Sequence, residues 1–198
     1  MQCLSEADRR SLLQLAREAV TEAVIHRRLP DRIPKEGIFE TRRGVFVTLH
    51  VGGRLQGCIG VTDPSERLGE AVTRCAASAA VEDPRFTPMN KTQLEDLSVE
   101  VSLLSPLEPI DPEKVEIGRH GLLIALHAQR GLLLPQVAVE HRLTREQFLE
   151  ETCRKAGLRR EAWRDPEARL FGFTCEILSD TQISPSLKTP PTANRPEI

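Results

Sequence analysis

The segment RLQGCIG at residues 54–60 is the part of the chain whose residue types most clearly suggest chemistry. Cys58 lies between two glycines of this segment, so few neighbouring side chains are available to cover its sulfur. Beside a cation, a cysteine thiolate is favoured and can act as a nucleophile or as a soft-metal ligand. Arg54, Arg85 and Lys155 are the candidate cations. The alternative is a structural Cys58 in the core, because free cysteine is among the most buried residue types. Both interpretations stay open at this point.

A second candidate is the loop Asp83-Pro84-Arg85-Phe86, which follows an alanine-rich segment of helical character. Arg85 could clamp a carboxylate or a phosphate, and Asp83 could orient it. The alternative is a structural turn in which Asp83 accepts backbone N–H groups and forms an internal salt bridge, since turn-forming aspartate is common.

Three further polar residues have a functional interpretation and a structural one. His120 lies in the turn Gly118-Arg119-His120-Gly121, where it could shuttle protons or simply face solvent. Gln136 follows Pro135 and could line a pocket or merely follow the end of a strand. Lys155 lies near the C-terminal end of a predicted helix. The helix dipole stabilises a cation there, which is by itself a sufficient structural explanation for a lysine at this position.

The elements that must position these residues follow from apolar periodicity and from turn residues. Helices are predicted at 5–29 with Ser5 as the cap, from Ser65 to the residue before Asp83-Pro84, at 92–97 and at 144–156. Strands are predicted at 44–51, 54–61, 99–104, 122–127 and 169–178. A further strand follows a turn at 129–131, and Pro135 ends it or places it at an edge.

Gly52-Gly53 separates two of these strands and predicts a tight hairpin. With a regular two-residue turn, Val47 faces Cys58 and Leu49 faces Gln56, so that each pair shares one face of the sheet. The glycines at 57 and 60 indicate that something approaches the second strand closely or that the strand bends.

Local hairpins outnumber crossover units, which favours an α+β fold with a largely antiparallel sheet covered by helices. A chain of 198 residues fits one domain, or one domain with a small lobe. We expect this domain to span residues 5–178. The proline-rich segment 179–198 is expected to be a mostly disordered tail or an extended arm.

Composition and missing motifs disfavour several function classes. A net charge of −2, six Phe, one Trp and no Tyr disfavour nucleic-acid binding. The cysteines are widely spaced and odd in number, which fits a cytoplasmic protein without a disulfide framework, and the histidines show no metal-ligand spacing. We expect no metal, no cofactor and no membrane segment. P-loop, dinucleotide, serine-hydrolase and zinc-protease motifs are missing from the sequence.

Six segments, taken in order, resemble the AMME-syndrome candidate-region protein family, whose prokaryotic members are called AmmeMemoRadiSam system protein A. The similarity runs from about residue 10 to about residue 178. The segments are GVFVTLHVGGRLQGCIG, AVEDPRFTPM, VEVSLLSPLE, GRHGL, LLLPQVAVE and CRKAGL.

The resemblance implies a larger sheet-and-helix part, a smaller lobe and a cleft between them. It implies that the protein is related to a component of a system that also contains a Memo-like protein and a radical S-adenosylmethionine enzyme. The resemblance does not define a reaction. The family's recurring polar positions fall on residues Cys58, Asp83, Arg85, His120 and Lys155. The family motif usually reads LRGCIG, whereas this chain has Gln56 in place of the arginine, so a charge is lost there.

Two functions follow as hypotheses, and the oligomeric state stays undetermined. In the first, the protein is an enzyme or enzyme-system component in which Cys58 is a nucleophile or ligand, His120 a proton shuttle and Arg85 an anion clamp. In the second, it is a non-catalytic module that holds a peptide or docks on a Memo-like or radical enzyme. Both use a cleft to which we assign Gln56, Gly57, Gly60 and Gln136.

Overall fold

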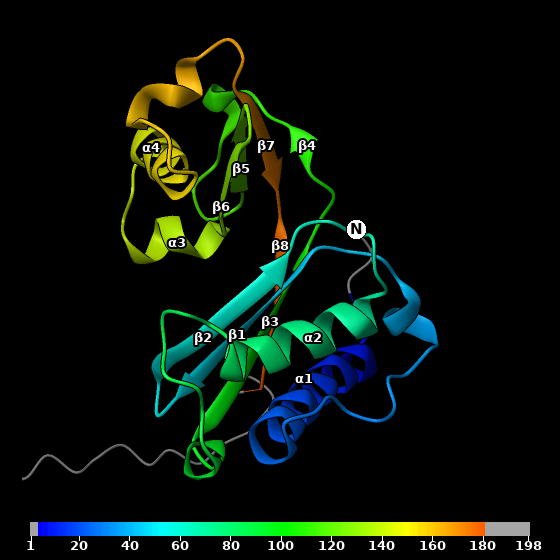
Figure 1. Ribbon diagram of the computed structural model, residues 1–198. Coiled ribbons are helices and arrows are strands. Elements are labelled where there is room, and N and C mark those ends of the chain that lie inside the picture. The colour runs from blue at the N-terminus through cyan, green and yellow to red at the C-terminus, as the bar shows by residue number, and fades with distance from the viewer. Residues whose placement is uncertain (1–3, 181–198) are drawn as a thin grey trace, which may run out of the picture.

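The computed structural model describes residues 4–180, which form two lobes, each built on an antiparallel sheet (Figure 1). The larger lobe contains α1 Glu6–His26, β1 Val45–Val51, β2 Arg54–Val61, α2 Leu68–Val81, β3 Leu97–Leu104 and β8 Cys175–Ser179. The smaller lobe contains β4 Glu108–Pro109, β5 Gly121–Leu126, β6 Gln129–Leu133, α3 Pro135–Glu140, α4 Arg145–Lys155 and β7 Arg169–Phe173. Short 3-10 helices lie at Gly37–Glu40, Lys91–Leu94, Pro112–Lys114 and Arg160–Arg164.

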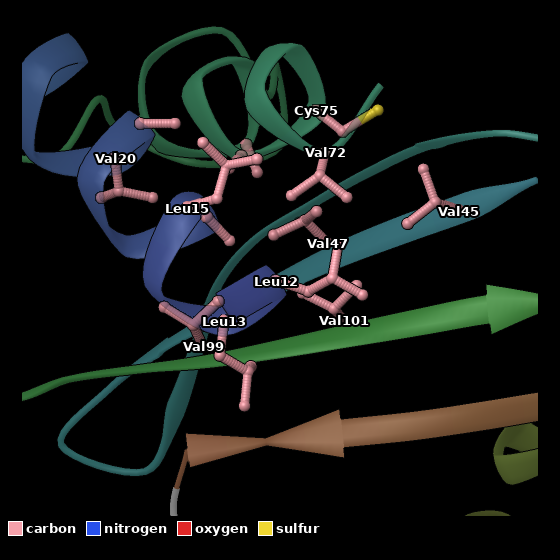
Figure 2. Close-up of a cluster of buried hydrophobic side chains, with 14 of the residues drawn as sticks. Leu12, Leu13, Leu15, Val20, Val45, Val47, Val72, Cys75, Val99 and Val101 are labelled. Carbon is pink, nitrogen blue, oxygen red and sulfur yellow. The ribbon is translucent and has the colours of Figure 1, made fainter. Parts of the chain in front are cut away.

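The larger lobe has a single helix-covered face. Its strands run in the order β2-β1-β3-β8, and α1 and α2 lie together against one side of them (Figure 1). Apolar residues at helical spacing meet apolar residues at alternate strand positions, so burial of both stripes drives this packing. Figure 2 shows the contact, in which the side chains are Leu12, Leu15, Val20, Val72, Cys75, Val45, Val47, Val99 and Val101.

The hairpin between β1 and β2 contains a bulge that changes which residues share a face. Val51 pairs with Arg54 and His50 with Leu55, but Leu49 then pairs with Gly57, so Gln56 is the extra residue. Beyond the bulge, Cys58 pairs with Thr48. The prediction that Val47 faces Cys58 is therefore wrong. Because side chains alternate along a strand, one extra residue puts Cys58 on the face opposite the helices.

The smaller lobe is inserted between β3 and β8. Its strands run in the order β4-β7-β5-β6, with α3 and α4 packed on them around buried Phe148 and Leu149. The segment predicted as one strand at 169–178 is two strands in different sheets, divided at Thr174. Ser105 on the other connection between the lobes holds this point. Its N–H donates to the Thr174 carbonyl (2.9 Å), and its Oγ accepts from the Thr174 N–H (3.0 Å).

The region around Pro135 also differs from the sequence prediction. Strand β6 lies at the edge of its sheet, as one of the two alternatives predicted, and ends at Leu133. Pro135 itself begins α3, a helix that the sequence analysis did not predict. Proline suits the first position of a helix, where its missing N–H would have no intrahelical partner. The hairpin turn before β6 lies between Leu126 and Gln129, earlier than predicted.

Helix boundaries were predicted more closely than strand continuity. Ser5 caps α1, as predicted, and a capping box of Thr144 and Gln147 opens α4 where the sequence predicted a helix to begin. Helix α2 begins at Leu68, so Ser65 is not its cap, and the helix expected at 92–97 is a 3-10 turn. The expected tail was predicted to begin at residue 179. Ser179 is the last residue of β8, and the part of the tail from residue 181 onward lies outside the described residues. Within residues 4–180, no helix combines the length and the apolar character needed to span a bilayer.

Candidate functional site

Cys58 lies at a cavity of about 360 Å³ that both lobes line. The larger lobe contributes Phe46, Cys58, Ile59, Asp83, Pro84 and Arg85, and the smaller lobe contributes Leu132, Leu133, Leu134, Val137 and Lys155. Four of the predicted site residues therefore meet here, namely Cys58, Asp83, Arg85 and Lys155. Cys58 and Lys155 are far apart in the sequence. They line the same cavity because Lys155 ends α4, a helix of the inserted lobe, and this lobe faces the strand that contains Cys58.

A carboxylate and a guanidinium clamp the backbone of Cys58. The Cys58 N–H donates to Asp83 Oδ2 at 2.9 Å, and Arg85 Nη2 donates to the Cys58 carbonyl at 2.9 Å. The two side chains also pair with each other, with Nε–Oδ1 at 2.9 Å and Nη2–Oδ2 at 2.6 Å. Such forked, charge-assisted contacts fix geometry strongly. Asp83 and Arg85 thus hold the loop after α2 against strand β2 at the cysteine.

Asp83 is buried, and the Arg85 guanidinium holds the pKa of its carboxyl down at about 2 despite that burial. Hydrogen bonds from the Cys58 and Arg85 N–H groups act in the same direction. Asp83 in turn raises the pKa of Arg85. Asp83 is therefore a permanent carboxylate at neutral pH, and both of its oxygens are occupied by donors of Cys58 and Arg85.

Two cations retain free hydrogen-bond donors at this cavity. Arg85 is about half exposed, and its Nη1 makes no hydrogen bond to residues 4–180. Lys155, the last residue of α4, is exposed, and within the described part of the chain its ammonium forms no ion pair. An anionic group that entered the cavity would meet both.

Thr48 is a site residue that the sequence analysis missed. Its hydroxyl donates to Cys58 Sγ at 3.3 Å from the neighbouring strand. The regular hairpin register placed a valine opposite Cys58, and only the bulge at Gln56 brings a hydroxyl there. The apolar wall from Leu132 to Val137 was also missed, because Pro135 was interpreted as a strand end.

His120 and Gln136 lie in other places. His120 lines a separate cavity of about 460 Å³, and its Nδ1 accepts from the Glu116 N–H at 3.0 Å. Gln136 lines a third cavity, of about 340 Å³, with Cys175. The structure therefore does not group either residue with Cys58, and any role for them remains a prediction.

The other residues predicted to line the cleft do not line the Cys58 cavity. They make packing contacts or a hydrogen bond instead, and they are Gln56, Gly57 and Gly60. A Cβ on Gly57 would lie 2.0 Å from the Ala79 carbonyl oxygen, so this glycine lets α2 approach β2. A Cβ on Gly60 would lie 2.3 Å from the Phe46 ring. Gln56 Nε2 donates to the Thr87 carbonyl at 2.8 Å, and Gln56 does not line the Cys58 cavity.

The other described thiols are in poorer surroundings for reactivity. Burial raises the pKa of Cys75 to about 11 and also raises the pKa of Cys153. Burial, with the Glu100 carboxylate nearby, raises the pKa of Cys175 to about 12. No cluster of three or more His, Cys, Asp or Glu side chains within residues 4–180 could hold a metal ion.

Comparison with known proteins identifies the family. The AMMECR1 family model matches residues 13–178. The chain belongs to the AMMECR1 family. This match spans both lobes and every residue of the Cys58 cavity.

Its relatives include archaeal proteins whose names state no activity. A protein of Methanothermobacter thermautotrophicus is 42% identical over 187 residues, covering 89% of this chain and 96% of the relative. A protein of Thermococcus kodakarensis is 44% identical over 183 residues, covering 85% and 88%. The crystal structure of an uncharacterised Pyrococcus horikoshii protein has a TM-score of 0.82 and 38% identity, covering 88% of this chain and 92% of that one.

Proposed function

We propose that this AMMECR1-family protein is a cytoplasmic enzyme or enzyme-system component in which Cys58 supplies the reactive group of an interlobe cleft. The observation that carries the proposal is the position of Cys58 on the wall of a cavity that two cations, Arg85 and Lys155, also line. Sulfur in the helix-packed core would have left only a binding role.

The chemistry we propose is attack on a carbonyl carbon by the Cys58 thiolate, whose proton has been released to solvent. The S–C bond forms as the C=O π bond breaks, and the electron pair moves to the oxygen. Arg85 Nη1 would stabilise negative charge that develops on the substrate, as oriented donors do in a cavity with apolar walls, and Lys155 would hold a charged group elsewhere on the substrate. Asp83 acts through Arg85 and through the Cys58 N–H, so it is a positioning residue. His120 lines a different cavity, and the proposal assigns it no proton transfer at Cys58.

The second candidate is a non-catalytic binding module. Leu132, Leu133, Leu134 and Val137 make much of the cavity wall apolar, which also suits a peptide side chain or a docking partner. The family resemblance suggests a Memo-like protein and a radical S-adenosylmethionine enzyme as the partners in either case.

A reconstitution separates the two candidates. A Memo-like protein and a radical S-adenosylmethionine enzyme are combined either with the wild-type protein or with its Cys58→Ser variant. Complex formation and the small-molecule products are measured in both mixtures. The enzyme proposal expects intact complexes but a loss of product with Cys58→Ser, while the matched variant Cys175→Ser behaves as wild type. Equal product from Cys58→Ser and wild type would refute the catalytic role and leave the binding module.

A further inference from the structure

We propose that the cleft takes an elongated amphipathic anion, in which an aliphatic chain ends in a carboxylate or a phosphate. This inference rests on the proposed function for one point, namely that the end of the ligand opposite the anionic group lies at Cys58. It deepens that proposal by naming the class of molecule that the cleft accommodates.

The Cys58 cavity shares part of its lining with a second groove on the smaller lobe. This groove, of about 690 Å³, is lined by Leu133, Val137, His141, Leu143, Glu151, Arg154 and Lys155. Leu133, Val137 and Lys155 line both spaces. The shared residues make the two spaces neighbours, so we expect a ligand longer than the Cys58 cavity to extend into this groove.

The walls are apolar where the two spaces join. Leu133, at the end of β6, and Val137, in the first turn of α3, are both half-buried. Leu133 also packs against the buried core of the smaller lobe. Leu132 and Leu134 extend this surface towards Cys58. Burial of an aliphatic chain on such a surface is favourable, by roughly 25 cal/mol for each Å² removed from water.

The unbalanced charge in the lining of the two spaces is positive. Asp83 is neutralised by Arg85, and Glu151 lies 3.4 Å from Arg154 as an ion pair. Lys155 has no carboxylate partner in the described part of the chain, so its ammonium charge is uncompensated.

The groove has further N–H donors in its lining. The side chain of Arg154 pairs with Glu151 but is still 63% exposed. His141 lines the same groove. An apolar passage with one uncompensated ammonium and further N–H donors matches a chain that carries a negative head group. A cationic amphiphile would meet the same walls with repulsion instead of attraction.

The test uses the full-length protein at pH 7 and calorimetric titration with octanoate and octyl phosphate. Acetate and inorganic phosphate carry the negative charge without the octyl group and therefore test the contribution of the alkyl chain. Octyltrimethylammonium carries the octyl group with a positive charge and tests the contribution of the negative charge. We expect both octyl anions to bind, the short anions to bind at least about tenfold more weakly, and the cation to give no binding. Preference between the two octyl anions identifies the head group.

Variants locate the binding. Lys155→Ala is expected to weaken octyl anion binding by about tenfold, because a charge-assisted contact is lost. Lys114→Ala removes the same charge from an exposed position outside the groove and is the matched control. Val137→Thr keeps the side-chain volume but places a hydroxyl against the alkyl chain, so it should weaken the octyl probes and leave acetate unaffected.

Binding and chemistry are separable in this design. Retained octyl anion binding by Cys58→Ser, with loss of product in the reconstituted system, supports both proposals. Retained binding with unchanged product refutes the thiol chemistry and leaves the ligand class standing. Equal binding of the octyl cation, no effect of Lys155→Ala, or binding of an acidic peptide in place of the octyl anions would overturn the inference.

Discussion

The hydroxyl of Thr48 lies 3.3 Å from the sulfur of Cys58, on the sheet face that α1 and α2 leave uncovered. This contact orients the sulfur along a surface that the smaller lobe faces, where Lys155 and Leu133 line the same cavity. A hydroxyl that donates to sulfur also stabilises negative charge on it. The environment of Cys58 is therefore set by its neighbouring strand as much as by its own segment.

Thr48→Val tests that contact with little change of volume. We expect alkylation of Cys58 by iodoacetamide to slow by roughly threefold to tenfold, because sulfur loses its hydroxyl donor. Thr48→Ser retains the donor and should keep a rate near that of wild type. Equal rates for the valine and serine variants would show that the hydroxyl does not influence the thiol.

The Asp83 carboxyl predicts a specific loss of stability in acid. Its folded pKa of about 2 lies below its ordinary value of 3.8, so the folded state binds protons less readily than the unfolded chain. The resulting stabilisation is present above about pH 4 and is lost as the pH falls towards 2, with a size of about 2 kcal/mol. Asp83→Asn should remove this part of the pH dependence in urea unfolding. Parallel curves for the two proteins would contradict the assignment.

Arg85 stabilises the loop through its forked geometry as well as its charge. Arg85→Met leaves the buried Asp83 carboxylate without its cation, and we expect the free energy of unfolding to fall by about 3 kcal/mol at pH 7. Arg85→Lys keeps a charge but not the two-pronged contact, so an intermediate loss is expected. Chemical denaturation measures both. A lysine variant as stable as wild type would show that charge alone suffices.

Gly57 is predicted to be essential for packing. The added methyl of Gly57→Ala would lie 2.0 Å from the Ala79 carbonyl oxygen, which is backbone and has little freedom to move. We expect a loss of about 3 kcal/mol or failure to fold. Gly60→Ala meets the Phe46 ring as well as nearby backbone, and Phe46→Ala should partly rescue it. Full stability of Gly57→Ala would mean that α2 is not held this close to β2.

Local patterns predicted the elements well where caps and turns are encoded within a few residues. Ser5, Thr144 and the Gly52-Gly53 turn are such cases, and the helices and hairpin they mark are present. The α+β class also followed from element order. These features depend on interactions between residues close in sequence.

Features that depend on the assembled lobes were missed. The bulge at Gln56 and the change of sheet at Thr174 have no local signal, because each is decided by the strands that pair across it. Residue type alone offered Arg54, Arg85 and Lys155 as cations for Cys58, and the family resemblance retained Arg85 and Lys155, the two that line its cavity. The same resemblance grouped His120 with Cys58, whereas the insertion of the smaller lobe puts His120 at another cavity.

The central claim is that the cleft exposes a reactive Cys58, and site-resolved alkylation with iodoacetamide tests it most directly. Rates at each cysteine are measured by peptide mass spectrometry in native protein and in urea-unfolded protein. We expect Cys58 to react in the native protein at least as fast as in the unfolded chain, while Cys75 and Cys153 are protected by about a hundredfold or more. Protection of Cys58 equal to that of Cys75 would contradict the account.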